Sequence, residues 1–215
     1  MGSRAKGFTL VELAIVLVII GIIIGALLKG QEMIFNAKVK RTVSLIKELM
    51  AAVYTYYDRY GYLPGDDPTA SQRWGRNAPD GNGDGIVCYQ FWDCAAGNQS
   101  RDEYKYLIRH LRYANFISGD PNEVNPWIPV PFGSTRLGVV NAIHIATWTD
   151  TGSPHYGKLV AHVLAIPGEA SEAIDRIMDD GNCTTGSLMA FDATVERWCN
   201  GTYSRDHSYD LHVFF

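Results

Sequence analysis

Proline and cysteine are absent from the beginning of the chain, and charge is almost absent there. The first proline is Pro64 and the first cysteine is Cys88. Between Lys6 and Lys29 the only charged residue is Glu12. Because a proline ring breaks the interior of a helix, its absence leaves this part of the chain free to form one uninterrupted helix. A run with so little charge is typical of a segment that crosses a membrane.

Strong positive charge and catalytic motifs are also absent. The formal net charge is −4, which argues against a general nucleic-acid binder held by phosphate contacts. The sequence contains no HExxH motif, no GxSxG motif and no phosphate-binding loop. We therefore expect no nucleic-acid partner and no enzymatic activity.

The apolar segment from Phe8 to Leu28 is long enough to span a membrane. At about 1.5 Å per residue it covers roughly 30 Å, the thickness of one bilayer core. Arg4 and Lys6 precede it, so the short N-terminus should stay in the cytoplasm and the rest should be exported. A cleaved signal peptide is the alternative, but its apolar region is shorter and ends at a small-residue cleavage site. Here Lys29 and a continuing helical pattern follow, so we expect the segment to be retained.

Residues 39–60 continue the helix in an amphipathic form. Apolar side chains recur at intervals of four and three, which is the spacing of one helix face. Gly61 then supplies a stop. We expect one helix from Phe8 to Tyr60 whose second half presses an apolar stripe against a head. The stripe consists of Val39, Val43, Ile46, Met50, Val53, Tyr57 and Tyr60.

Residues 61–215 are expected to form an α+β head. The stretch 61–99 is rich in Gly, Pro, Asp and Asn and predicts a long connecting loop. A capping box over Ser100–Glu103 predicts the start of a helix with one apolar face, formed by Tyr104, Leu107, Ile108 and Leu111. A second helix is predicted over 169–180, with Ala173, Ile174 and Ile177 facing inward. Strands are predicted at about 139–147, 157–166, 187–192, 194–198 and 209–215. A sheet packed on the 39–60 stripe would cover both apolar surfaces.

The cysteines all lie in this head. Cys88, Cys94, Cys183 and Cys199 are an even number on one side of the predicted membrane segment, which predicts two disulfides outside the cytoplasm. Three connectivities are open at this point. A zinc site is disfavoured, because the sequence has no CxxC motif and no histidine next to a cysteine.

A short acidic stretch within 80–87 raises the question of a metal. Asp80, Asn82 and Asp84 alternate before a glycine, as in the first half of an EF-hand calcium loop. Phe91 stands where that loop would place its bidentate glutamate, and the candidates to replace that glutamate are Asp93 or the Asp66-Asp67 pair. The alternative is a turn in which these side chains cap their own backbone. Ca²⁺ is thus a candidate cofactor with an incomplete ligand set.

The stretch KGFTLVELAIVLVIIGIIIG combines a short basic leader ending in Gly7 with Phe8, Thr9, Leu10 and Glu12 at the start of an apolar helix. In this combination the chain resembles a type IV prepilin or one of its pseudopilin relatives. The resemblance implies that a membrane prepilin peptidase cuts between Gly7 and Phe8 and methylates the new Phe8 amine. It also implies a lollipop-shaped subunit, with an antiparallel β-sheet in its head, that leaves the membrane for a helical filament.

Glu12, Gly21 and Gly25 are the candidate assembly residues. A carboxylate in an apolar environment is tolerated when a cation neutralises it, and cleavage would create one at the Phe8 amine of the same or an adjacent subunit. The alternative is that Glu12 only reaches the cytoplasmic interface. Gly21 and Gly25 form a GxxxG pattern, which can let helices approach closely.

These features predict three parts and one function. Residues 1–7 are the leader, 8–60 the long helix with 8–28 in the membrane or filament core, and 61–215 the head. We expect a structural subunit of a type IV pilus-like extracellular filament, the alternatives being a type II secretion pseudopilin or a minor tip pilin for adhesion or recognition. Expected partners are identical or related subunits, the prepilin peptidase, an inner-membrane assembly platform, and the bacterial inner membrane before assembly.

Overall fold

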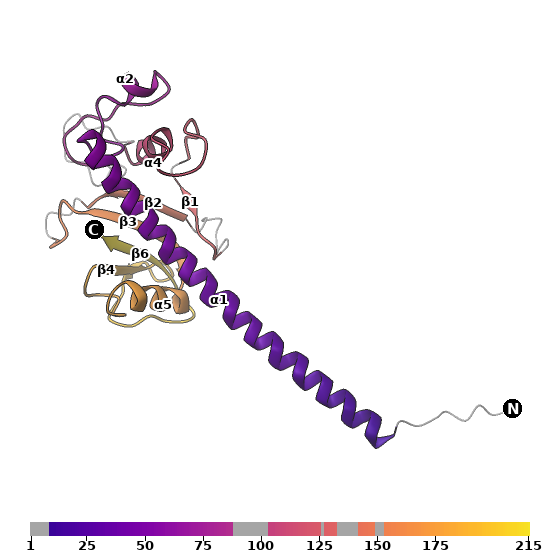
Figure 1. The fold of residues 1–215 in the computed structure, drawn as a ribbon. Helices are drawn as coiled ribbons and strands as arrows, with labels where there is room; N and C mark the ends of the chain where they lie inside the picture. The colour runs from indigo at the N-terminus through magenta and orange to yellow at the C-terminus, as the bar shows by residue number, and fades with distance from the viewer. Residues whose placement is uncertain (1–8, 88–102, 126, 133–141, 149–152) are drawn as a thin grey trace. The chain divides into compact units, whose positions relative to one another are not determined.

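The computed structural model describes residues 9–87, 103–125, 127–132, 142–148 and 153–215, with only the backbone described for 142–144. The chain divides into two compact units, Met1–Lys38 and Val39–Phe215. Helix α1 (Leu10–Tyr60) contributes residues to both units (Figure 1).

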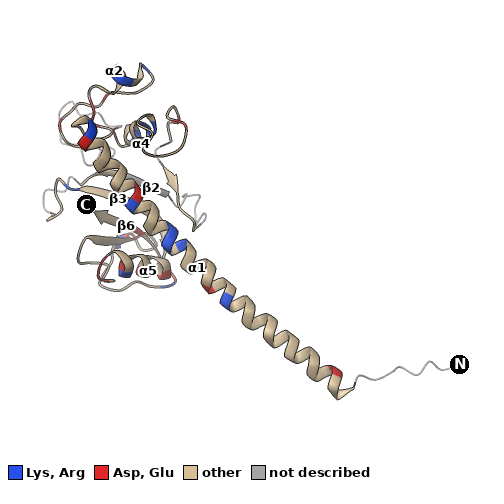
Figure 2. Ribbon diagram, viewed as in Figure 1, with Lys and Arg blue, Asp and Glu red and all other residues tan. Residues whose placement is uncertain are grey.

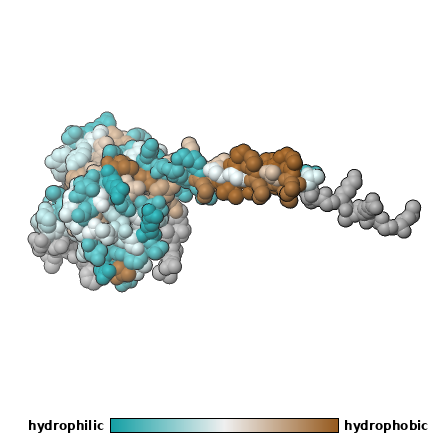
Figure 3. All heavy atoms as spheres, turned by 90° about the horizontal axis from the view of Figure 1, so that it is seen from below, coloured by the Kyte–Doolittle hydropathy of each residue, from teal (hydrophilic) through white to brown (hydrophobic). Residues whose placement is uncertain are grey.

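In the first unit, α1 is apolar on every side. Every residue from Leu10 to Lys29 is exposed. This part of the helix is almost entirely free of charge colours in Figure 2 and is the largest brown, hydrophobic area in Figure 3. Charge returns with Lys29, whose Nζ lies 2.7 Å from a carboxylate oxygen of Glu32. By length and composition the helix can cross a membrane.

The second unit contains an antiparallel sheet, as predicted. Its strand order is β1-β2-β3-β6-β4-β5, and each neighbouring pair is antiparallel. The C-terminal strand β6 lies between β3 and β4, so the last residues of the chain are held in the middle of the sheet. The strands are β1 (Ile128–Pro129), β2 (Ala142–Thr147), β3 (Leu159–Pro167), β4 (Leu188–Asp192), β5 (Arg197–Trp198) and β6 (Ser208–Phe214).

A bulge near the end of β3 directs the chain into the next helix. The register of β3 against β6 shifts between Val163 and Ile166. Ala165 lies in this shift with a φ of 57°, and its N–H donates to Oδ1 of Asp210 at 2.8 Å. Because a positive φ is unfavourable for alanine, this hydrogen bond helps to hold the bulge. The chain then enters α5 (Gly168–Met178) at Gly168, where a Cβ would collide with the carbonyl oxygen of Ser204.

The predicted helices are confirmed with small shifts at their ends. The first is α4 (Glu103–Tyr113), and the predicted start at Ser100 lies outside the described residues. The second, predicted over 169–180, is α5. Ile177 was wrongly expected to face inward: it is half exposed, and Asp175 is buried instead. The predicted loop 61–99 contains an additional short helix, α2 (Ala70–Trp74).

The buried face of α1 in the second unit differs from the predicted stripe. Val39, Val43, Ile46 and Val53 are buried as expected. Farther along, Leu49, Ala52 and Tyr56 are buried in place of Met50, Tyr57 and Tyr60. The physical reason is a change of partner. The end of the helix packs against other parts of the head than the sheet, since Tyr56 stacks on His110 of α4 and donates to Asp67 Oδ2 at 2.6 Å.

Candidate functional site

Thr9 and Glu12 form a capping box at the start of α1. The carboxylate of Glu12 accepts hydrogen bonds from the Thr9 N–H at 2.9 Å and from the Thr9 hydroxyl at 2.8 Å. In return the Thr9 hydroxyl accepts the N–H of Glu12 at 3.2 Å. Two backbone donors that a helix start leaves without intrahelical partners are thereby satisfied. Glu12 thus has a role inside its own chain, in addition to the predicted pairing with the Phe8 amine.

The two glycines of the GxxxG pattern have no steric role within the chain. A Cβ placed on Gly21 or Gly25 would meet no atom within 4 Å. Glycine in a helix interior costs about 1 kcal/mol relative to alanine, and no contact among the described residues offsets that cost. Gly7 and Phe8, the predicted cleavage residues, lie outside the described residues.

A disulfide joins Cys183 to Cys199, with their Cα atoms 5.9 Å apart. Both cysteines bond to the backbone of β4: the Cys183 carbonyl accepts the N–H of Ala190 at 3.0 Å, and the Cys199 N–H donates to the Ala190 carbonyl at 3.0 Å. This pairing is one of those that the sequence left open. Cys88 and Cys94 lie outside the described residues, so their disulfide stays a prediction.

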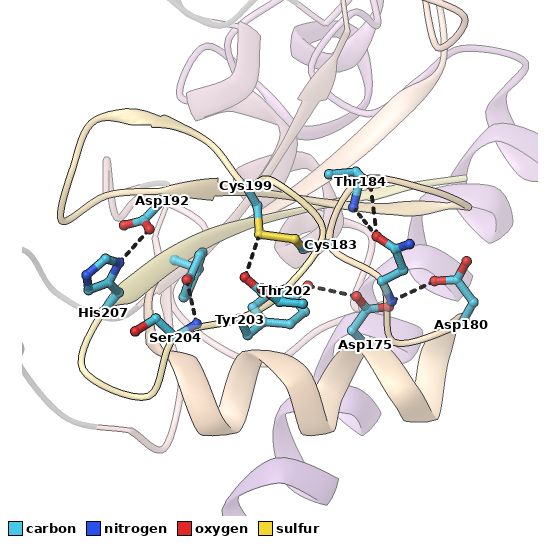
Figure 4. The surroundings of a disulfide bond; sticks show 12 residues. Asp175, Asp180, Cys183, Thr184, Asp192, Cys199, Thr202, Tyr203, Ser204 and His207 are labelled. Atoms are coloured by element: carbon cyan, nitrogen blue, oxygen red, sulfur yellow. Dashed lines mark hydrogen bonds and ion pairs between the residues drawn. A yellow bond between two sulfur atoms is a disulfide. The ribbon is translucent and has the colours of Figure 1, made fainter.

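Polar contacts tie the disulfide region to α5 and β4 (Figure 4). The Tyr203 hydroxyl donates to Oδ2 of Asp175 at 2.7 Å, and burial raises the pKa of this Asp175 carboxyl. His207 Nδ1 lies 2.6 Å from Oδ2 of Asp192. Partial burial would raise the pKa of Asp192, but the hydrogen bond from His207 and two backbone N–H groups leave it below its ordinary value. The segment that follows the disulfide is therefore bound to α5 through Tyr203 and to β4 through His207.

The three predicted calcium ligands are engaged with the protein itself. Asp80 accepts the N–H and the hydroxyl of Ser71 at 2.7 and 2.6 Å, at the start of α2. Asn82 and Asp84 bond to each other and cap the backbone: the Asp84 N–H donates to Asn82 Oδ1, and the Ile86 N–H to Asp84 Oδ1, both at 2.9 Å. These contacts are those of the alternative reading, a self-capping turn. Calcium binding stays a prediction.

Asp66 holds this turn against the rest of the head. Its carboxylate is buried and accepts the N–H groups of Gly83, Asp84 and Gly85 at 2.7 to 3.1 Å. Burial raises the pKa of Asp66, and these hydrogen bonds counteract part of the rise. Among the described residues, one carboxylate oxygen each from Asp66, Asp84 and Glu103 lie within 4.8 Å of one another, and the same holds for Asp175, Asp179 and Asp180.

His110 fixes the segment after α1 to α4. The ring is fully buried, and its Nδ1 accepts the N–H of Gly65 at 2.9 Å. Nε2 therefore carries the proton and donates to the Pro79 carbonyl at 2.7 Å. Burial lowers the pKa of His110 to about 4. The imidazole is thus neutral and structural.

Two comparisons with known proteins found a match. Residues 2–28 match the family described as "Prokaryotic N-terminal methylation motif". The chain is also 37% identical over 71 residues to the "Fimbrial protein" of Neisseria meningitidis serogroup B (strain ATCC BAA-335 / MC58). These matches support the resemblance of the chain to type IV pilins. The prepilin-type motif and the apolar helix fit a membrane-anchored pilin.

These comparisons cover only part of the chain. The match to the Neisseria fimbrial protein covers 33% of this chain and 42% of that protein, so the chain spans less than half of the relative's length. No solved structure matches the chain. The head must therefore be interpreted from its own geometry.

Sequence reasoning missed two features of these sites. The Thr9–Glu12 capping box has a readable signal, a threonine followed three residues later by glutamate before an apolar run. The burial of Asp66 and His110 has no such signal, because their partners at Gly83 and Gly65 are distant in the sequence. Only the folded chain brings these groups together.

Proposed function

We propose that this chain is a structural subunit of a type IV pilus-like extracellular filament. It is made with a leader of residues 1–7, cut by a prepilin peptidase between Gly7 and Phe8, and methylated at Phe8. It resides in the inner membrane before assembly. An inner-membrane assembly platform then adds it to the filament through its N-terminal helix. The observation that carries this proposal is the start of α1, where an apolar helix exposed on all sides begins at a single carboxylate.

The exposed apolar surface supports a partner that is itself apolar. Burying one large aliphatic side chain is worth about 1.5–3 kcal/mol, and the segment from Leu10 to Leu28 is composed largely of such side chains. None of these residues is buried within the chain. A lipid bilayer covers this surface before assembly, and the helices of neighbouring subunits cover it afterwards.

Glu12 gives that assembly its register. In water the carboxylate is satisfied by Thr9 and solvent, whereas in a helix-packed core it needs a cation. A methylated Phe8 amine is a cation at the same end of the helix. Subunits displaced along the filament axis would leave both charges uncompensated, so the pair favours one register.

Processing and abundance test the proposal together. Intact-mass and N-terminal peptide analysis of the chain in its native host should show Phe8 as the first residue, with one added methyl group. Filaments sheared from the surface should contain the chain as a major component. An intact leader in mature protein, or cleavage beyond Leu28, would overturn the proposal.

Gly7→Leu provides the matched control. It leaves the mature sequence unchanged and places a bulky side chain at the position where the peptidase must approach the backbone. The expected result is unprocessed chain in the membrane and no filaments. Correct processing combined with a periplasmic location and no surface filament would instead favour a pseudopilin, and presence only in trace amounts at filament ends would favour a tip pilin.

A further inference from the structure

In one row of the sheet, histidine and methionine, residue types that can ligate a metal, occupy neighbouring strands. In the strand register, His162 of β3 lies directly opposite His212 of β6. His212 in turn lies opposite Met189 of β4. On the other side, His144 of β2 occupies the position opposite His162. Residues directly opposite each other in an antiparallel sheet share a face, with Cβ atoms about 4.5–5.5 Å apart.

This row faces away from α1. Strand residues alternate between the two faces of a sheet, and Phe215, which follows β6, contacts Tyr54 of α1 with ring centroids 5.8 Å apart. Leu211 and Val213 share that face and are buried. His212 and its neighbour Phe214 therefore lie on the opposite face.

Aromatic rings surround the two described histidines. The rings of His162 and His212 meet edge to face with centroids 4.7 Å apart. Trp148 and Trp198 lie 5.4 and 5.2 Å from the His212 ring, measured between centroids. Met189 is half-buried at the end of the series. The setting is apolar and polarisable, with no described carboxylate or lysine among these ring contacts.

One histidine of this pair and two neighbouring rings carry a buried nitrogen atom without a hydrogen-bond partner. His212 Nδ1 and Trp148 Nε1 are buried and make no hydrogen bond, and the same is true of Nδ1 in His155, whose ring stacks on Phe214. A buried nitrogen without a partner carries a desolvation cost of about 1–3 kcal/mol. Burial lowers the pKa of His212 to about 4, so its imidazole is neutral and keeps a lone pair.

Neutral imidazole and thioether together select a particular class of metal. Calcium and magnesium prefer oxygen ligands, and zinc is bound by cysteine, histidine and carboxylate rather than by methionine. A thioether is a soft ligand that favours Cu(I), and imidazole binds copper well. We propose that His162, His212 and Met189 are the ligands of a Cu(I) site on the sheet face opposite α1. This site is independent of filament assembly.

A competition titration on the full-length chain in detergent micelles tests the proposal. Cu(I) is kept reduced with ascorbate and offered together with a chromophoric Cu(I) chelator, so that the loss of the chelator's colour reports transfer to the protein. The parent protein should withdraw one equivalent of Cu(I), and Zn²⁺ in excess should not displace it. Quenching of tryptophan fluorescence should accompany binding, because Trp148 and Trp198 both adjoin His212.

Two ligand variants and two matched controls define the site. Met189→Leu conserves volume and should weaken Cu(I) binding by at least about tenfold, since even outer-shell changes at metal sites cost about 10–100-fold. His212→Gln should weaken it further. Met178→Leu and His207→Gln, which lie outside the row, should bind copper as the parent does.

Thermal unfolding without copper separates ligand loss from misfolding. Met189→Leu should unfold at the same temperature as the parent, so its loss of affinity reports a ligand. If His212→Gln fails to fold, the Met189→Leu comparison still decides. The proposal is overturned if the parent leaves the chelator's copper untouched, if Met189→Leu binds as tightly as the parent, or if the two control variants lose affinity equally.

Discussion

The two halves of helix α1 share one secondary structure and have opposite surroundings. From Leu10 to Lys29 every residue is exposed, although almost all are apolar. From Val39 to Tyr60 the helix is amphipathic and buries one face, on which Ile46 and Val53 are fully buried. The more hydrophobic half is the one that buries nothing within the chain.

The difference shows that hydrophobicity and burial are separate properties of a segment. An amphipathic helix has one apolar face, which a single sheet is able to cover. A helix that is apolar all round needs apolar surroundings on all sides, which a head of this size does not supply. Its natural environments are lipid and other helices of the same kind. Changes in the first half should therefore affect assembly, and changes in the second half should affect folding.

The largest expected effect is that of Glu12→Gln on assembly. Gln conserves the side chain's shape and is able to accept the Thr9 N–H, so the capping box survives while the charge is lost. Leaving the partner charge uncompensated costs about 3–5 kcal/mol, which corresponds to a loss of filaments by two to three orders of magnitude. Quantitative immunoblotting of sheared filaments and membranes should show cleaved subunit retained in the membrane.

Thr9→Val separates the charge of Glu12 from its capping role. The variant removes the hydroxyl of the cap and leaves the carboxylate, and an N-cap is worth about 1 kcal/mol. Filament yield should therefore fall by less than tenfold. If the two variants lower the yield equally, helix capping rather than charge pairing explains Glu12.

A matched pair of isoleucines in the two halves should differ in their effect on folding. Ile46→Ala removes a fully buried side chain and should lower the head's free energy of unfolding by about 2–5 kcal/mol. Ile19→Ala removes an exposed one and should change it by less than about 0.5 kcal/mol. Denaturant unfolding of the full-length chain in detergent, followed by near-ultraviolet circular dichroism, measures both. Equal losses in the two variants would contradict the separation of roles.

Acidification should destabilise the head but leave the apolar helix unaffected. The pKa values of His110 and His212 are lowered by burial to about 4, below the ordinary value near 6.5. The unfolded chain therefore binds protons that the folded chain does not. The contribution of each neutral histidine to the free energy of unfolding is fully present above about pH 6.5. It is lost as the pH falls toward 4, with a decrease of about 2 kcal/mol per histidine between pH 7 and pH 5.

Neighbouring charges of both signs also affect the pKa of His110. Arg73 and Arg109 lower its pKa further, while Asp80 and the bond to Pro79 raise it. Asp66, Asp175 and Asp210 have raised pKa values, so their protonation favours the folded state and offsets part of the loss at the acid end. His110→Gln should flatten the curve of unfolding free energy between pH 6.5 and 5. An unchanged slope in that range would refute the role of His110.

The smallest effect is expected from Gly21→Ala. Within the chain the new methyl group meets nothing, and the helix gains about 1 kcal/mol in propensity. If helices approach closely at Gly21 in the filament, yield should fall several-fold. Gly30→Ala is the control, because that glycine also has open surroundings and lies outside the GxxxG pattern. Equal yields from both variants would remove Gly21 from the assembly residues.

The parts that were predictable depend on local signals. The apolar and the amphipathic halves of α1, most strands and α5 follow from the composition and hydrophobic spacing of neighbouring residues. Errors arose where distant contacts decided the outcome. Tyr56 replaced Tyr57 on the buried face because Asp67 and His110 are its partners. Strand β1 (Ile128–Pro129) is too short for any pattern and exists only because β2 pairs with it.

The sequence by itself determined the chemistry of the first 28 residues. Basic residues, a glycine, one carboxylate and a long apolar run follow one another there, so the expected consequences for membranes and assembly can be read in order. Tertiary structure decided which cysteine pairs with Cys183, how the acidic loop is held by Asp66, and which side chains share a row of the sheet. The physical reason is that strand register and hydrogen bonds between remote segments depend on how the whole head closes. His162, His212 and Met189 are far apart along the chain, and only the position of β6 between β3 and β4 makes them neighbours.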